Sequence, residues 1–312
     1  MSTRMTKPFS LALISFTAAV LVAPPLLQAD QATRPAGEAR KEQKVVRTVK
    51  SKDGTAIAFE QAGSGPVVIL VSGALSDRRG GARLAAQVAP HFTVINYDRR
   101  GRGDSGDTQP YAVQREVEDI EALIDHAGGT AHLFGASSGA ALALEAASKL
   151  PGKVKKAALF EPPFVSDDSR APMPPDIAAR FDEMLAAGKR GEVVEQFMTT
   201  AVLVPADAVA QMRQSPMWPA MEKLAHTLAY DMAVMGDTLF GKPLPADRWK
   251  SARMPVLVLD GGNSDAWLRN SARALAKVLP VAEHRTLEGQ DHAAPFVAPQ
   301  VVAPVLVEFF GR

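Results

Sequence analysis

The chain has 312 residues, of which 46% are hydrophobic and 22% charged, and its formal net charge is +1. This balance is that of an ordinary globular protein, and the length allows one large α/β domain with an insertion. A net charge near zero excludes a global field that would attract nucleic acid or an anionic membrane. The chain has no cysteine, which excludes disulfides, thiolate metal sites and cysteine nucleophiles.

The first 29 residues have the pattern of a secretory signal peptide. Arg4 and Lys7 precede a mostly apolar, uncharged run over residues 9–23, and Ala29 provides a small residue at the cleavage point. The run is short for a bilayer span of about 20 residues, so a cleaved signal is favoured over an anchor. Cleavage would leave a soluble, periplasmic or secreted protein of net charge −1. The polar residues 30–44 are expected to form a disordered leader.

From residue 45 onward, apolar runs separated by turn residues predict strands that alternate with helices. The expected strands are residues 45–49, 56–61, 67–71, 92–97, the run that reaches Gly135, and residues 154–160, 256–259 and 283–287. The expected helices are residues 83–89, 113–126, the run from Gly139 to residue 150, and residues 271–279 and 301–310. The alternation predicts an α/β fold with a mostly parallel, doubly wound sheet.

The segment after the predicted strand 154–160 interrupts this alternation. Prolines there separate helical patterns near residues 176–187, 192–201, 207–214 and 220–235. We therefore interpret residues 164–250 as a helical cap inserted into a core formed by residues 45–163 and 251–312. Eight of the eleven methionines lie in this segment. Most are expected to pack between helices, and some are candidates for lining an adaptable apolar pocket.

The sequence Gly135-Ala136-Ser137-Ser138-Gly139 matches the Gly-x-Ser-x-Gly pattern of a nucleophile turn between a strand and a helix. Such a turn points a serine hydroxyl out of the sheet, and glycine on both sides lets the strand and the helix approach closely. The two glycines centre the turn on Ser137 rather than on Ser138. Ser137 is therefore the candidate nucleophile.

A second glycine pattern, Gly101 to Gly106, formally matches the Gly-x-Gly-x-x-Gly pattern of a dinucleotide site. Pro110 separates these glycines from the next predicted helix, so no helix N-terminus is placed to receive a pyrophosphate. We exclude a dinucleotide cofactor on this ground.

Five motifs in order make the chain resemble the α/β-hydrolase superfamily, in its form with a serine nucleophile and a helical cap. The resemblance runs from about residue 45 to the C-terminus. It is carried by Ser72-Gly73-Ala74, the turn from Asp98 to Ser105, the turn around Ser137, Gly262-Asn263-Ser264-Asp265 and Gly289-Gln290-Asp291-His292. In the family, the arginine–glycine turn has a structural role. Serine rather than aspartate at position 137 argues against the family's dehalogenases and epoxide hydrolases.

The resemblance implies a base and an acid after the serine, in the order serine, acid, histidine. His292 lies just past the last predicted strand, where the family places its base. His132 is expected in the core or the sheet, and the remaining histidines are expected in loops or on surfaces: His91, His126, His226 and His284.

For the acid, Asp265 lies beyond the strand 256–259, at the family's usual position. Glu161 ends the preceding strand and is the alternative acid. Asp260 is expected to brace its turn, and Asp265 is also a candidate cap of the next helix.

The resemblance also implies an oxyanion hole of two backbone N–H groups. One belongs to Ser138, and the other to the loop after residue 71, with Ala74 first and Leu75 next. Many relatives carry His-Gly in that loop where this chain has Ser72-Gly73.

The sequence predicts a serine hydrolase of small carboxylic esters or related acyl compounds, acting through Ser137, His292 and Asp265 and an acyl-enzyme. No metal or organic cofactor is implied, and the expected partner is a small-molecule acyl substrate, with no nucleic acid and no stable membrane anchor. One alternative is the same triad used for lactone opening, C–C bond cleavage or perhydrolysis. Another is a catalytically silent protein that binds ligands under the cap.

Overall fold

The computed structural model describes residues 45–312 of the protein. The predicted signal peptide and leader lie outside the described residues. Within residues 45–312, no helix is long and apolar enough to cross a membrane.

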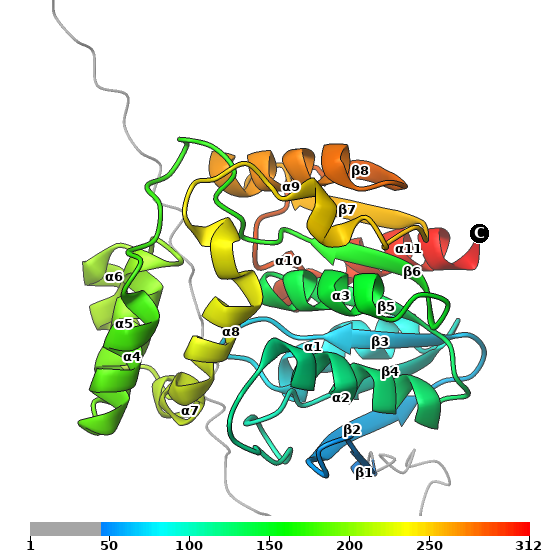
Figure 1. The fold of residues 1–312 in the computed structure, drawn as a ribbon, viewed down its shortest axis with the longest axis horizontal. Helices are drawn as coiled ribbons and strands as arrows, with labels where there is room; N and C mark the ends of the chain where they lie inside the picture. Colours follow the sequence, from blue (N-terminus) through cyan, green and yellow to red (C-terminus); the bar gives the residue numbers. More distant parts are fainter. Residues whose placement is uncertain (1–44) are drawn as a thin grey trace, which may run out of the picture. The chain divides into compact units, whose positions relative to one another are not determined.

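The core of the described chain is one eight-stranded sheet with the order β1-β2-β4-β3-β5-β6-β7-β8 (Figure 1). The strands are β1 (Arg47–Lys50), β2 (Ala56–Ala62), β3 (Val67–Val71), β4 (Thr93–Tyr97), β5 (Ala131–Ala136), β6 (Val154–Phe160), β7 (Val256–Gly261) and β8 (Ala282–Leu287). Strand β2 pairs antiparallel with β1 and β4, and every other pair in the sheet is parallel. The predicted mostly parallel sheet is confirmed.

Helices cover both faces of this sheet because the central strands are apolar on both sides. In β3, Ile69 and Val71 face the cluster that includes α2 (Val113–His126), α3 (Ser138–Lys149) and α9 (Ala266–Val278). Val68 and Leu70 face the opposite cluster, with α1 (Arg78–Val88) and α11 (Pro299–Gly311). The doubly wound architecture is therefore confirmed.

Helices α1 and α9 begin well before the residues that the sequence pattern predicts. Helix α1 begins at Arg78 instead of residue 83, because Asp77 caps it: the Arg79 N–H donates to Asp77 Oδ1 at 2.9 Å. Helix α9 begins at Ala266 instead of residue 271, and its first turn buries Trp267 and Leu268. The short helix α10 (Ala294–Val297), just after His292, was not predicted.

We call residues 164–250, which lie between β6 and β7, the cap. Its helices are α4 (Ile177–Ala186), α5 (Arg190–Thr200), α6 (Ala206–Met212), α7 (Trp218–Leu224) and α8 (Leu228–Met235), with short 3₁₀ helices at Ala225–Thr227, Gly236–Leu239 and Ala246–Trp249. The fourth helical pattern, predicted as one helix, is thus divided at residue 225. Figure 1 shows the cap helices beyond the carboxyl ends of the parallel strands.

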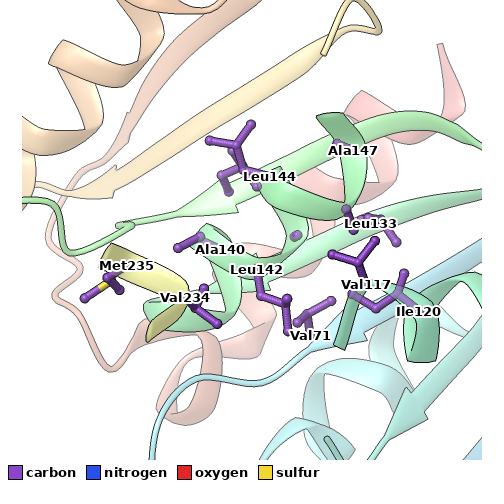
Figure 2. Packing of buried hydrophobic residues seen from close by; sticks show 14 of the residues in the cluster. Val71, Val117, Ile120, Leu133, Ala140, Leu142, Leu144, Ala147, Val234 and Met235 are labelled. Carbon is purple, nitrogen blue, oxygen red and sulfur yellow. The ribbon is translucent and has the colours of Figure 1, made fainter. Parts of the chain in front are cut away.

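Helix α3 joins the core and the cap into one apolar cluster (Figure 2). Its small and branched side chains, such as Ala140 and Leu142, are completely buried against β5 and α2. Val234 and Met235 of α8 belong to the same cluster, and Figure 2 shows them beside Ala140. Fully burying one such aliphatic side chain stabilises a fold by roughly 1.5–3 kcal/mol. The buried side chains of α8 therefore stabilise its packing against α3, the helix that follows Ser137.

Candidate active site

Ser137 stands at a strained turn between β5 and α3. Its backbone has φ 57° and ψ −130°, and its N–H donates to the carbonyl of Phe160 at 2.9 Å. A non-glycine residue in this conformation costs on the order of 1–3 kcal/mol and persists where the surrounding structure holds it. The turn that the sequence predicts around Ser137 is therefore present.

The glycines around Ser137 are required by close backbone approach. A Cβ on Gly135 would lie 2.3 Å from the Gly139 carbonyl oxygen, and a Cβ on Gly139 would lie 2.3 Å from the Val71 carbonyl oxygen. Gly73 approaches from the loop after β3, where an added Cβ would lie 3.1 Å from Ser137 Cβ. Three separate segments therefore meet at the serine only because these positions lack side chains.

His292 lies beside the carboxylate of Glu161. Its Nδ1 is 2.6 Å from Glu161 Oε2, and the second carboxylate oxygen accepts the N–H of Gly261 at 2.7 Å. The Glu161 side chain is completely buried, whereas the imidazole is 36% exposed. With a proton on Nδ1 donated to the carboxylate, the neutral imidazole has Nε2 free to accept a proton.

The turn after β7 is joined to the loop that carries His292. The Gly262 N–H donates to the Leu287 carbonyl at 2.9 Å, and the Asn263 N–H donates to the Gln290 carbonyl at 2.8 Å. A Cβ on Gly261 would lie 2.5 Å from that same Gln290 oxygen. The ends of β6, β7 and β8 thus fix the distance between Glu161 and His292.

The structure does not bring Asp265, the first-choice acid of the sequence analysis, to His292. Asp265 is exposed at the start of α9, and its carboxylate does not bond the first turn of that helix. Across residues 45–312, no hydrogen bond or ion pair joins it to His292. The geometry favours the alternative acid, Glu161.

The other acid and histidine candidates have partners of their own. Asp260 is completely buried, with Oδ2 2.9 Å from His284 Nε2. His132 lies in β5 with its ring stacked on Phe310 at 4.9 Å, and burial lowers its pKa to about 4. His132 lies in the sheet, as predicted, and its lowered pKa makes it neutral at neutral pH.

Two backbone N–H groups near Ser137 are available for an oxyanion. Ser138 is the first residue of α3, so its N–H has no acceptor within the helix, and the helix dipole adds partial positive charge there. Ala74 is half-buried in the loop after β3, and its N–H donates to no acceptor in the described chain. Leu75, next in that loop, has a positive φ of 53°.

Two arginines of the turn after β4 donate hydrogen bonds to backbone carbonyls of the loop that contains Ala74. Arg102 Nη1 donates to the carbonyls of Gly73 at 2.5 Å and Ser76 at 3.3 Å. Arg99 Nη1 donates to the Ser72 carbonyl at 3.2 Å. Both guanidinium groups are buried, so the arginine–glycine turn supports the backbone of the candidate hole.

The sequence analysis missed Asp231, a completely buried carboxylate on the cap helix α8. It accepts hydrogen bonds from Arg99, Arg102 and the hydroxyl of Ser138. Burial raises the pKa of Asp231, but the two guanidinium groups and the hydroxyl outweigh it, so the pKa lies below its ordinary value. Asp231 is therefore an ionised acid beside the candidate site. No local motif in α8 marks it.

The described residues contain no group of three or more histidine, aspartate or glutamate side chains that could hold a metal ion.

A family model described as the alpha/beta hydrolase family matches residues 68–305, which is most of the chain. The chain belongs to the α/β hydrolase family. A solved α/β hydrolase from Sphaerobacter thermophilus is 59% identical, with a TM-score of 0.78, and the match covers 85% of this chain and all of that one. A thermophilic esterase from Thermogutta terrifontis shares the fold at 23% identity and a TM-score of 0.65, over 86% and 98% of the two chains. The predicted superfamily is confirmed.

Relatives identified by sequence similarity also carry hydrolase names. The chain is 27% identical over 265 residues to a 2-(acetamidomethylene)succinate hydrolase from Mesorhizobium japonicum, covering 80% of this chain and 89% of that protein. An uncharacterised hydrolase of Bacillus subtilis is 32% identical over 113 residues, a match that spans 35% of this chain and 42% of that protein. The match to the family model therefore assigns this chain to a family of hydrolases.

Proposed function

We propose that this protein is a serine hydrolase in which Ser137 is the nucleophile, His292 the base and Glu161 the acid that orients the base. The contact of 2.6 Å between His292 and Glu161 carries this proposal. A free serine hydroxyl is a poor nucleophile, and a histidine held in one tautomer by a buried carboxylate activates it. Glu161 takes the role first assigned to Asp265, because the carboxylate of Glu161 is the one that contacts the imidazole.

In the proposed reaction, Ser137 Oγ attacks the acyl carbon while its proton passes to His292 Nε2. The N–H groups of Ser138 and Ala74 stabilise the negative oxygen of the tetrahedral intermediate. His292 then protonates the leaving group, which departs and leaves the acyl-enzyme. A water molecule, deprotonated by His292, releases the acid and restores the serine hydroxyl.

The proposed substrates are small carboxylic esters or related acyl compounds. The same residues can open lactones, cleave C–C bonds or perform perhydrolysis, since all these reactions begin with the same nucleophile and base. The substrate in the name of the Mesorhizobium relative contains an acetamido group, so amides should be tested as substrates too. The panel should therefore include p-nitrophenyl esters, lactones and amides of matched acyl length.

A fluorophosphonate probe tests the proposal directly, because it modifies a serine only when a base and an oxyanion hole activate it. Mass spectrometry of the labelled mature protein should locate the adduct on Ser137. Ser137→Ala should lower ester turnover by about 10⁴–10⁶-fold, and His292→Ala should abolish labelling. A folded protein that takes no label, yet shows a ligand-dependent rise in Tm, would instead support the silent binding protein.

We also propose that the protein is exported. The positive start, the uncharged apolar run and the small residue Ala29 support this. Expression of the full chain followed by N-terminal sequencing should give a mature protein that begins at Asp30. A product that keeps an intact N-terminus and stays in the cytoplasm would contradict it.

A further inference from the structure

A cap side chain, Asp231 of α8, is hydrogen-bonded to residues that surround the candidate oxyanion hole. Asp231 Oδ1 accepts the hydroxyl of Ser138 at 2.8 Å and Arg99 Nη1 at 2.7 Å. Arg102 Nη2 donates to both oxygens of the same carboxylate, at 2.9 and 2.8 Å. Asp231 therefore contacts directly the residue that supplies one proposed oxyanion donor.

The same two arginines connect Asp231 to the other proposed donor. Through their second contacts they hold the carbonyls of Ser72, Gly73 and Ser76, which flank Ala74 on both sides. In the part of the chain that the structure describes, Asp231 is the only carboxylate paired with Arg102, whose Nε has no hydrogen-bond partner. The direction of the Arg102 guanidinium thus depends on Asp231.

We infer that Asp231 is a positioning residue for the oxyanion hole, setting the Ser138 and Ala74 N–H groups at once from the cap. This inference rests on the proposed function. Oxyanion donors act only when they are held where negative charge develops, and a misplacement of about 1 Å costs on the order of 10²-fold in rate. A buried, ionised carboxylate that joins both sides of the hole supplies that rigidity.

A neighbouring ion pair provides a matched control. Arg100, next in the same turn, donates from Nε and Nη2 to Asp119 at 2.8 and 2.7 Å, and both side chains are buried. Its other contacts go to Asp53 and the Arg115 carbonyl, and not to the Ala74 loop. Asp119→Asn therefore removes a buried carboxylate charge beside an arginine without touching the hole.

The experiment measures the rate constant and the apparent affinity of fluorophosphonate modification, and kcat and KM on p-nitrophenyl acetate, for the full mature enzyme. Asp231→Asn should lower the modification rate constant and kcat by about 10–10²-fold, with the apparent affinity and KM within about threefold. The midpoint of the pH–rate profile should not move, because His292 and Glu161 lie outside this network. Asp119→Asn should keep kcat within about twofold of the wild-type value, even if its Tm falls as much as the Tm of Asp231→Asn.

Ser138→Ala keeps the inference testable if Asp231→Asn does not fold. It deletes only the hydroxyl bonded to Asp231 and retains the backbone donor, so we expect the rate constant to fall about 3–10-fold, the value of one hydrogen bond. A folded Asp231→Asn or Ser138→Ala enzyme that reacts at the wild-type rate would overturn the inference. Equal losses of kcat in Asp231→Asn and Asp119→Asn would do the same. Labelling that persists in Ser137→Ala, in contrast, would refute the proposed function itself.

Discussion

The two sides of Ser137 are built in different ways. On the acid side, Glu161 and His292 are placed by turns at the ends of β6, β7 and β8, all within the core. On the oxyanion side, Ser138 and the Ala74 loop are held by buried charges, one of which comes from the cap. Under the proposed function, we expect proton transfer to be independent of the cap and stabilisation of the oxyanion to depend on it. Changes in the cap should therefore alter kcat without shifting the pH profile.

The largest expected effect is on the acid side. Glu161→Gln keeps the shape but removes the charge that selects the tautomer of His292, so kcat should fall by about 10³–10⁴-fold. Asp265→Asn is the matched control and should stay within about twofold, because Asp265 is exposed and does not contact His292. Turnover of p-nitrophenyl acetate by both variants checks this prediction. A larger loss in Asp265→Asn would return the acid role to Asp265.

A smaller effect is expected where the two sides meet, at Gly139. An added Cβ would lie 2.3 Å from the carbonyl oxygen of Val71, so Gly139→Ala must push α3 away from the end of β3. Overpacking of this kind lowers the free energy of unfolding by about 2–3 kcal/mol, measurable by urea denaturation. Gly106→Ala is the control, since its Cβ would meet no atom closer than 3.4 Å. Equal losses in both variants would contradict the close-approach argument.

The smallest expected effect concerns His132, which should influence the pH dependence of stability but not the pH dependence of activity. The pKa of His132 is lowered from 6.5 to about 4 by burial, with a smaller effect of Lys156. Between pH 6.5 and 4 the unfolded chain therefore binds a proton that the folded chain does not, so stability falls as the pH drops through this window. Allowing for solvent screening of the ring, the loss is about 1–2 kcal/mol.

His132→Leu should flatten the pH dependence of stability between pH 6.5 and 4 and leave the pH–rate profile unchanged. Urea unfolding at pH 4.5, 5.5 and 6.5 measures the first, and p-nitrophenyl acetate turnover the second. If the variant retains the full slope, another group is responsible for the loss of stability.

Local patterns predicted most elements well where one physical signal dominates. Strand β3 and helix α2 have the predicted boundaries, because a β-branched apolar run and a strong 3.6-residue periodicity leave little ambiguity. The starts of α1 and α9 were misplaced, because a side-chain cap at Asp77 and the burial of Trp267 extend helices beyond their periodic part.

The sequence by itself determined the fold class, the strained turn at Ser137, the position of His292 and two candidate acids. These follow from local chemistry: glycine spacing, apolar periodicity and the order of motifs along the chain. Only the tertiary structure decided that Glu161 contacts His292, 131 residues away, and that Asp231 contacts Ser138, 93 residues away. Which buried carboxylate meets which partner depends on where strand ends and cap helices converge, and no local pattern encodes that convergence.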